Sequence, residues 1–200
     1  MISHTNDLIA NNFAKGQQTY LLPLTFSDLR DVGEKLEIIA YGGDVWELRV
    51  DLLQEPGVES TIPSSDYVKS QLNHLQKVSN LPIIFTIRTV KQGGRFPDDA
   101  EKAALKLMLL AQEEGCQYID VECDWPRWLI DHVVAGKGST KIIASFHDWA
   151  GQTSWKDFWL LKRSILESYG GMSICIHASI EFQKSRTNSN RRTQVQYLGQ

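Results

Sequence analysis

The stretch KIIASFHDW, residues 141–149, decides the fold. Its apolar run Ile142–Ala144 follows a glycine-containing turn, a pattern that predicts a short, wholly buried strand. Ser145, His147 and Asp148 come directly after this run and place polar groups where the strand ends. In many α/β enzymes the catalytic residues lie in this position, at the carboxyl edge of a parallel sheet. The alternative is a capping histidine followed by an N-cap aspartate for the next helix, and both interpretations are open at this point.

The composition describes one ordinary globular domain. The chain has 200 residues, of which 42% are hydrophobic and 22% charged, so it can bury a sizeable core. A net charge of −3 gives no electrostatic reason to expect nucleic acid. Cys116, Cys123 and Cys175 form no CxxC pair, which favours reduced thiols in a cytoplasmic protein and no zinc site. We expect neither a signal peptide nor a membrane span, because no apolar run is long enough.

Strand and helix patterns alternate along the chain. Repeated βα units of this kind predict a parallel sheet, either doubly wound or closed into a barrel. No glycine-rich turn follows the first strand, which argues against a dinucleotide-binding Rossmann domain. Charged residues on the strands favour the barrel, whose site lies at the carboxyl ends of its strands. The expected strands are 20–26, 44–53, 81–86, 118–122 and 141–149, and the expected helices are 28–40, 66–78, 98–114, 125–134 and 155–169.

The two ends of the chain differ from the middle. Residues 1–18 form a polar lead-in, and 19–182 form the predicted α/β domain. Its last part, 172–182, is strand-like without a clean alternation. Residues 183–200 are polar and basic, which predicts a disordered tail. A basic tail can contact RNA or a membrane, but without interleaved aromatic residues a solvated tail is favoured, so we expect neither partner.

Seven polar side chains lie at the expected strand ends, and a barrel would bring them to one mouth. Two arginines beside several carboxylates suit a small, anionic, hydroxylated substrate, and a histidine can act as general acid and base. Simple pairing is the alternative for Glu47 with Arg49 and for Arg88 with Glu122, while Asp120 could cap a helix or pair with a lysine. The seven residues are Glu47, Arg49, Asp51, Arg88, Asp120, Glu122 and His147.

Four motifs resemble the type I 3-dehydroquinate dehydratases, above all the dehydratase domain of the fungal pentafunctional shikimate-pathway enzyme and the related quinate repressors. The resemblance covers about residues 19–170. It implies a (β/α)8 TIM barrel that uses no metal or nucleotide cofactor. It also implies a lyase that converts 3-dehydroquinate into 3-dehydroshikimate and water through a lysine imine. The motifs are ELRVD at 47–51, FTIRTVKQGGRFPDD at 85–99, YIDVE at 118–122 and IIASFHDW at 142–149.

The resemblance assigns roles to individual residues. His147 would transfer protons, and the substrate-binding residues would be Glu47, Arg49 and Arg88. The supporting residues would be Asp51, Gln92, Asp120 and Glu122. Gln92 stands where some members of the family have a glutamate that supports the histidine, so it brings hydrogen bonds without charge.

The largest departure from the family lies near the end of the chain. Ile174 stands where the resemblance places the imine-forming lysine. The abrupt change at Gly171 suggests a truncated or misread end and an incomplete barrel of about five to six βα units. We therefore expect impaired catalysis, with a quinate repressor-like metabolite-binding protein as the alternative. The expected partner is a small hydroxy acid, and a homodimer is left open.

Overall fold

The structure is a computed structural model that describes residues 7–33 and 35–148, Asp157 and Leu160, and the backbone of 174–180 and 195–198. Helices and strands alternate along most of this part of the chain. Its strands are β1 (Leu21–Leu24), β2 (Val45–Arg49), β3 (Ile83–Thr86), β4 (Tyr118–Glu122), β5 (Lys141–Asp148), β6 (Ile174–Ile180) and β7 (Val195–Leu198). Its helices are α1 (Leu8–Ala14), α2 (Lys35–Ala40), α3 (Ser65–Val78), α4 (Glu101–Glu113) and α5 (Arg127–Gly136), with 3-10 helices η1 (Leu29–Asp31) and η2 (Val50–Leu52).

The strands form one sheet whose spatial order, β1 to β7, is the order of the sequence. Strands β1 to β6 pair in parallel, and β7 pairs antiparallel with β6. A doubly wound sheet would reverse direction at a switch point, whereas sequential order is what the wall of a barrel requires. The predicted α/β fold of TIM-barrel type is therefore confirmed for this part of the chain.

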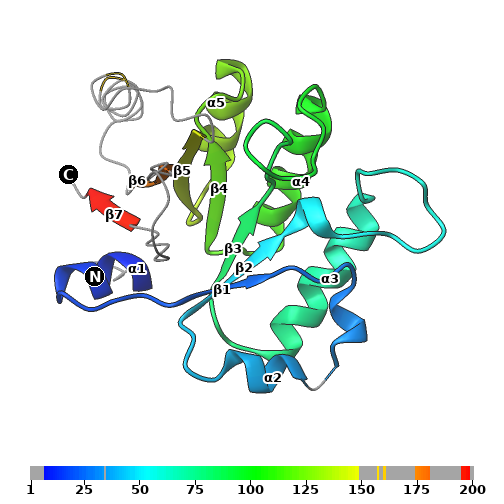
Figure 1. Ribbon diagram of the computed structural model, residues 1–200, viewed down its shortest axis with the longest axis horizontal. Helices are drawn as coiled ribbons and strands as arrows, with labels where there is room; N and C mark the ends of the chain where they lie inside the picture. Colours follow the sequence, from blue (N-terminus) through cyan, green and yellow to red (C-terminus); the bar gives the residue numbers. More distant parts are fainter. Residues whose placement is uncertain are drawn as a thin grey trace, which may run out of the picture.

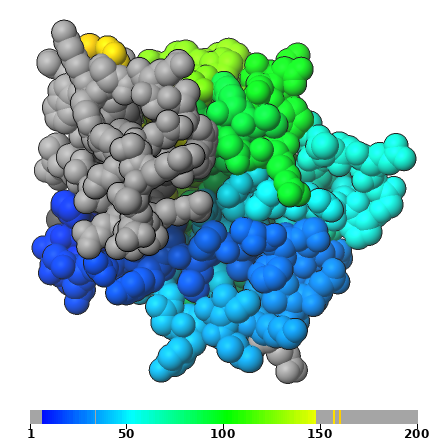
Figure 2. Space-filling view, in the orientation of Figure 1, coloured from blue at the N-terminus to red at the C-terminus, as the bar shows by residue number. Residues whose placement is uncertain are grey.

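Helices α3, α4 and α5 lie along the outer side of the sheet (Figure 1). Alternate strand residues point toward them, because strand side chains change face at every position. Trp46, Leu48, Phe85, Ile119 and Val121 are at most 2% exposed and belong to this outer core. Figure 2 shows the same unit filled out by side chains, with α4 and α5 in green shades beside the blue N-terminal segments.

The opposite face of the strands begins with an apolar floor. Val45, Ile84, Tyr118 and Ile143 form a second buried cluster, which Ile9 of α1 completes. The Tyr118 hydroxyl donates to the Asp7 carboxylate at 2.9 Å and accepts from the Ile9 backbone N–H at 3.3 Å. The predicted polar lead-in thus contains a helix that the sequence did not reveal, docked against the amino-terminal end of the strands.

Several predicted elements have different bounds in the structure, and three of them show a physical reason. The helix expected over 28–40 is divided into η1 and α2, because Gly33 between them has a positive φ of 57°. The strand expected over 44–53 ends at Arg49, where the chain turns into η2. The helix expected from Asp98 begins at Glu101, while the Asp98 carboxylate accepts a hydrogen bond from the Lys91 backbone N–H.

Some predicted elements lie wholly or partly outside the residues that the structure describes. The helix expected over 155–169 lies outside them, apart from Asp157 and Leu160, which are helical. The segment predicted as a disordered tail, 183–200, contains β7, a strand that the sequence analysis did not predict. In the described part of the chain, no helix has the length and apolar character needed to cross a membrane.

Candidate functional site

A polar layer lies directly above the apolar floor, toward the carboxyl ends of the strands. Each of four neighbouring strands contributes residues two and four positions after its floor residue, so the same period of two that buries the floor aligns the polar groups. Six of the seven predicted strand-end residues belong to this layer. Its members are Glu47 and Arg49 from β2, Thr86 and Arg88 from β3 and its end, Asp120 and Glu122 from β4, and Ser145 and His147 from β5.

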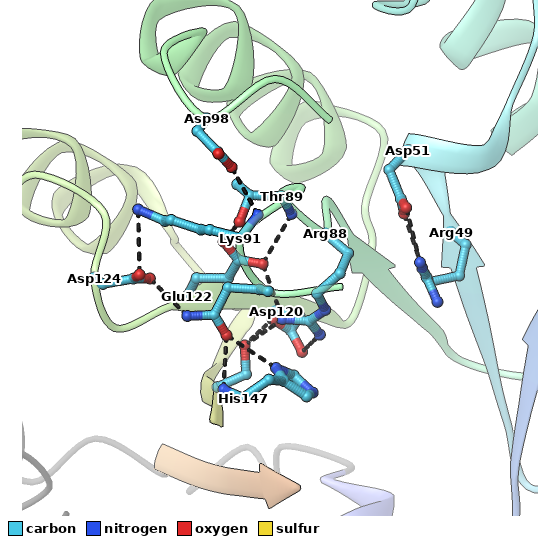
Figure 3. Close-up of polar contacts among 12 residues, drawn as sticks. Arg49, Asp51, Arg88, Thr89, Lys91, Asp98, Asp120, Glu122, Asp124 and His147 are labelled. Carbon is cyan, nitrogen blue, oxygen red and sulfur yellow. Dashed lines mark hydrogen bonds and ion pairs between the residues drawn. The ribbon is translucent and has the colours of Figure 1, made fainter. Parts of the chain in front are cut away.

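Arg88 is the centre of the layer (Figure 3). Its Nη2 donates to Asp120 Oδ2 at 2.9 Å, and its Nη1 donates to Glu122 Oε1 at 3.2 Å and to Ser145 Oγ at 2.8 Å. Ser145 Oγ in turn donates to Asp120 Oδ1. The side chain of Arg88 is only 7% exposed and that of Glu122 is fully buried. The pairing of Arg88 with Glu122, raised from the sequence as the simple alternative, is thus present within a larger network.

The carboxylates of this layer are largely buried. Burial raises the pKa of Glu122 to about 7, against the lowering effect of Thr89 and of the Arg88 charge. Burial and the neighbouring Asp120 also raise the pKa of Glu47. Burial opposes the charge on Arg88, but Asp120 and Glu122 more than compensate and raise its pKa. The layer therefore stabilises the Arg88 cation and favours the neutral forms of Glu47 and Glu122.

Arg49 and Asp51 form a separate pair beside this network (Figure 3). Arg49 Nε and Nη2 donate to the two oxygens of Asp51 at 2.8 and 2.7 Å. Asp51 also accepts the Arg95 backbone N–H at 3.1 Å. The sequence analysis placed Asp51 on the strand face with Glu47, but η2 carries it off the strand. Asp51 consequently occupies the planar fork of Arg49 and joins it to the loop after β3.

That loop, residues 89–97, is folded tightly by its own backbone. The Gly94 N–H donates to the Thr89 carbonyl at 2.7 Å, and the Phe96 N–H donates to the Arg88 carbonyl at 3.0 Å. A Cβ on Gly94 would come within 2.1 Å of the Arg88 carbonyl oxygen, so only glycine fits. The turn places the Thr89 N–H and hydroxyl on Glu122 at 3.0 and 2.6 Å.

The same loop brings Gln92 to the end of β5. Gln92 is 2% exposed, and its Oε1 accepts the His147 backbone N–H at 2.7 Å and lies 3.1 Å from His147 Nδ1. Its Nε2 donates to Asp124 Oδ1 at 2.9 Å. The expectation that Gln92 hydrogen-bonds to the histidine is thus confirmed.

Several members of the network were not among the residues predicted from the sequence. Ser145 was noted at the end of its strand but not counted among the seven, although it lies two positions before His147 on the same face. No sequence pattern identifies Thr89, Lys91 and Asp124 as site residues, because their positions depend on the course of loops. Within the described residues, no group of three or more His, Cys, Asp or Glu side chains is arranged to hold a metal ion.

The next strand, β6, is described by its backbone alone. It pairs with β5 so that His177 is opposite Ser145 and Ser179 is opposite His147. Its sequence, ICIHASI, contains no lysine. Ile174, which stands at the position given for the imine-forming lysine, begins this strand one position before the partner of Ile143.

Sequentially ordered parallel strands with an arginine, acids and a histidine at their carboxyl ends define a β/α-barrel domain with a polar site in its mouth. The family model described as Type I 3-dehydroquinase matches residues 20–171, three quarters of the chain. The chain therefore belongs to the type I 3-dehydroquinase family and is a dehydroquinate dehydratase-like domain. The matched range agrees with the one inferred from the four sequence motifs.

Solved structures agree with this assignment. Dehydroquinate dehydratase and shikimate dehydrogenase from S. pombe AroM is 37% identical, with a TM-score of 0.76 over 84% of this chain and 32% of that one. The 3-dehydroquinate dehydratase from Aquifex aeolicus VF5 is 26% identical, with a TM-score of 0.55 over 80% and 67%. The type I enzyme from Clostridium difficile, at 22% identity and a TM-score of 0.58 over 80% and 74%, agrees in fold. The chain spans about a third of the S. pombe protein.

Proposed function

We propose that this domain binds 3-dehydroquinate, or a closely related hydroxylated carboxylate, in the polar layer at the carboxyl ends of β2 to β5. The observation that carries the proposal is the arrangement of Arg88. Three of its five N–H groups donate to Asp120, Glu122 and Ser145. Its Nε–H and second Nη2–H point to one side as a planar fork, which suits a ligand carboxylate or a pair of hydroxyls.

The neighbouring groups complete the chemistry of such a site. Glu47 and Asp120 can accept hydrogen bonds from ligand hydroxyls, because carboxylate oxygens each accept more than one. His147 would move a proton at the carbon next to the ketone and at the departing hydroxyl. Arg49 keeps both Nη1 donors for a ligand, since Asp51 engages its Nε and Nη2. The roles of Glu47, Arg49 and His147 are the ones that the family resemblance assigns, whereas Asp120 was expected only to support the site.

We further propose that turnover through an imine is impaired in this chain. The reaction uses a lysine amine to convert the ketone into a protonated imine, which accepts the electron pair left when the neighbouring C–H bond breaks. Residues 172–180 carry no lysine, and Ile174 stands at the expected position. Without that electron sink, turnover falls at least about a thousandfold.

Calorimetry tests the binding proposal. The ligand is 3-dehydroquinate, and the proteins are the wild type, Arg88→Lys and Arg127→Lys. Lysine keeps the charge of Arg88 but loses the fork, so we expect affinity to fall at least about tenfold. The same substitution at Arg127, on the exposed face of α5 and paired with Asp131, should leave binding unchanged. Equal affinities in all three proteins would contradict the proposed site.

Trapping with borohydride tests the second proposal. Borohydride reduces an imine to a stable secondary amine, so an intact mass spectrum reports any lysine that reacts with the ketone. We expect the mass to stay unchanged and no enone absorbance to develop. A mass increase that depends on 3-dehydroquinate, together with enone formation, would overturn the impaired state and leave the binding site intact.

A second candidate function follows from the same features. Intact binding groups beside a missing lysine suit a metabolite-binding regulatory protein similar to the quinate repressors. Such a protein forms no imine, so the ketone does not increase its affinity. It should therefore bind quinate at least as tightly as 3-dehydroquinate. A strong preference for the ketone in the same calorimetric experiment would favour the dehydratase-like function instead.

A further inference from the structure

The chain of contacts behind His147 extends beyond Gln92. Gln92 Nε2 donates to Asp124 Oδ1, and Asp124 Oδ2 lies 3.2 Å from the Lys91 ammonium. Lys91 also lies over the Trp125 ring, 5.9 Å from its centroid. The loops after β3 and β4 are thereby joined to the end of β5 at one point beside the site. Figure 3 shows Lys91, Asp124 and His147 arranged around this junction.

The orientation of the Gln92 amide is determined twice. The His147 backbone N–H can only donate, so the atom 2.7 Å away must be the amide oxygen. The Asp124 carboxylate can only accept, so the atom 2.9 Å from it must be the amide nitrogen. One demand comes from β5 and the other from the loop after β4, and the two agree. The orientation of the amide is thus fixed by its two partners.

The fixed amide determines the state of the imidazole ring. Gln92 Oε1 lies 3.1 Å from His147 Nδ1, and a carbonyl oxygen accepts but cannot donate. Nδ1 must therefore carry the hydrogen, and in the neutral ring the lone pair lies on Nε2. The free imidazole side chain prefers the opposite tautomer, so the surroundings must impose this one.

We propose that Asp124 is a positioning residue, which acts through the Gln92 amide to hold His147 in the tautomer with hydrogen on Nδ1 and Nε2 as proton acceptor. This inference rests on the proposed function for the role of His147, but the tautomer itself belongs to the ligand-free protein. Lys91, which lies over the Trp125 ring, pairs with the Asp124 carboxylate from the other side. Gln92 stands where some members of the family have a glutamate, which presents an acceptor oxygen in either orientation. A glutamine must be oriented, and Asp124 supplies one of the two contacts that orient it.

Nitrogen NMR of the histidine side chains tests the proposal directly in the ligand-free protein. Long-range proton–nitrogen spectra distinguish a protonated Nδ1 from a protonated Nε2, and the His147→Gln variant assigns the signal. Wild type should show hydrogen on Nδ1 of His147. Asp124→Leu, which removes the acceptor at similar size, leaves the amide oriented by the His147 backbone N–H alone, so part of the signal should shift toward the Nε2-protonated form.

Two variants test whether Asp124 acts by orienting the Gln92 amide or by its charge. Asp124→Asn keeps an acceptor oxygen and should preserve the wild-type tautomer, although it loses the ion pair with Lys91. Lys91→Met should also preserve it. Because the side chain of Asp124 is 34% exposed, none of these variants places a new polar group in the core. An unchanged tautomer in Asp124→Leu, or a changed one in Asp124→Asn, would overturn the proposal. Neither result would affect the calorimetric test of ligand binding.

Discussion

Replacing Glu122 with glutamine should change how the stability of the domain depends on pH. Glu122 Oε1 accepts from the Thr89 N–H and from Arg88, and Oε2 accepts from the Thr89 hydroxyl. A glutamine can keep all three contacts, because its oxygen accepts the first two and its nitrogen donates to the hydroxyl, which then turns around. The substitution therefore removes a buried charge and little else.

The sign of this pH dependence follows from the number of protons that the folded and the unfolded states bind. Burial raises the pKa of Glu122 from 4.5 to about 7, so between these values the folded protein holds a proton that the unfolded chain has lost. Its contribution to stability is fully present below pH 4.5 and is lost as the pH rises through about 7. A change of this size corresponds to about 3 kcal/mol in the free energy of unfolding.

Urea unfolding of wild type, Glu122→Gln and Glu113→Gln between pH 4.5 and 8 measures this contribution. Glu113 is an exposed carboxylate on α4, and its variant controls for the loss of one charge. Relative to wild type, Glu122→Gln should gain about 3 kcal/mol across the range. Parallel curves for wild type and Glu122→Gln would refute the argument that burial dominates over the hydrogen bonds from Thr89 and the charge of Arg88.

Three further variants test other parts of the structure. Gly94→Ala should lower the free energy of unfolding by about 2 kcal/mol or more, because its methyl group meets the Arg88 carbonyl, and urea unfolding measures the loss. Tyr118→Phe should cost about 1–3 kcal/mol and increase hydrogen exchange in α1, since the hydroxyl joins that helix to the sheet; unchanged exchange would contradict this. Gln92→Glu should raise the midpoint of the His147 titration by about one pH unit, because the new carboxylate stabilises the imidazolium; an NMR titration that shows no rise would contradict it.

Periodicity alone predicted most of the site. Asp120 and Glu122 alternate with buried apolar residues on β4, so their common face followed from the sequence, as did the place of Arg88 and His147 at strand ends. Asp51 was misplaced, because strand alternation was extended past Arg49 into η2. Nothing in the local sequence marks that turn as the end of the strand.

Contacts that depend on loop paths could not be predicted. Gln92 reaches Asp124 because the loop after β3 folds back on itself through its own backbone hydrogen bonds, and the loop after β4, far away in the sequence, lies beside it. The helix α1 was missed for a different reason. Its sequence, LIANNFA, is only one to two turns long, and helices of this length form in water only when tertiary contacts hold them.

The central claim is that a hydroxylated carboxylate binds beside Arg88 and His147 without covalent capture. The side-chain NMR signals of His147, followed while 3-dehydroquinate is added, test it most directly. We predict a saturable shift of the His147 signals in wild type that is greatly reduced in Arg88→Lys, while the signals of His132, an exposed residue on α5, stay in place. His147 signals that do not move at saturating ligand, or that move equally in both proteins, would contradict the account.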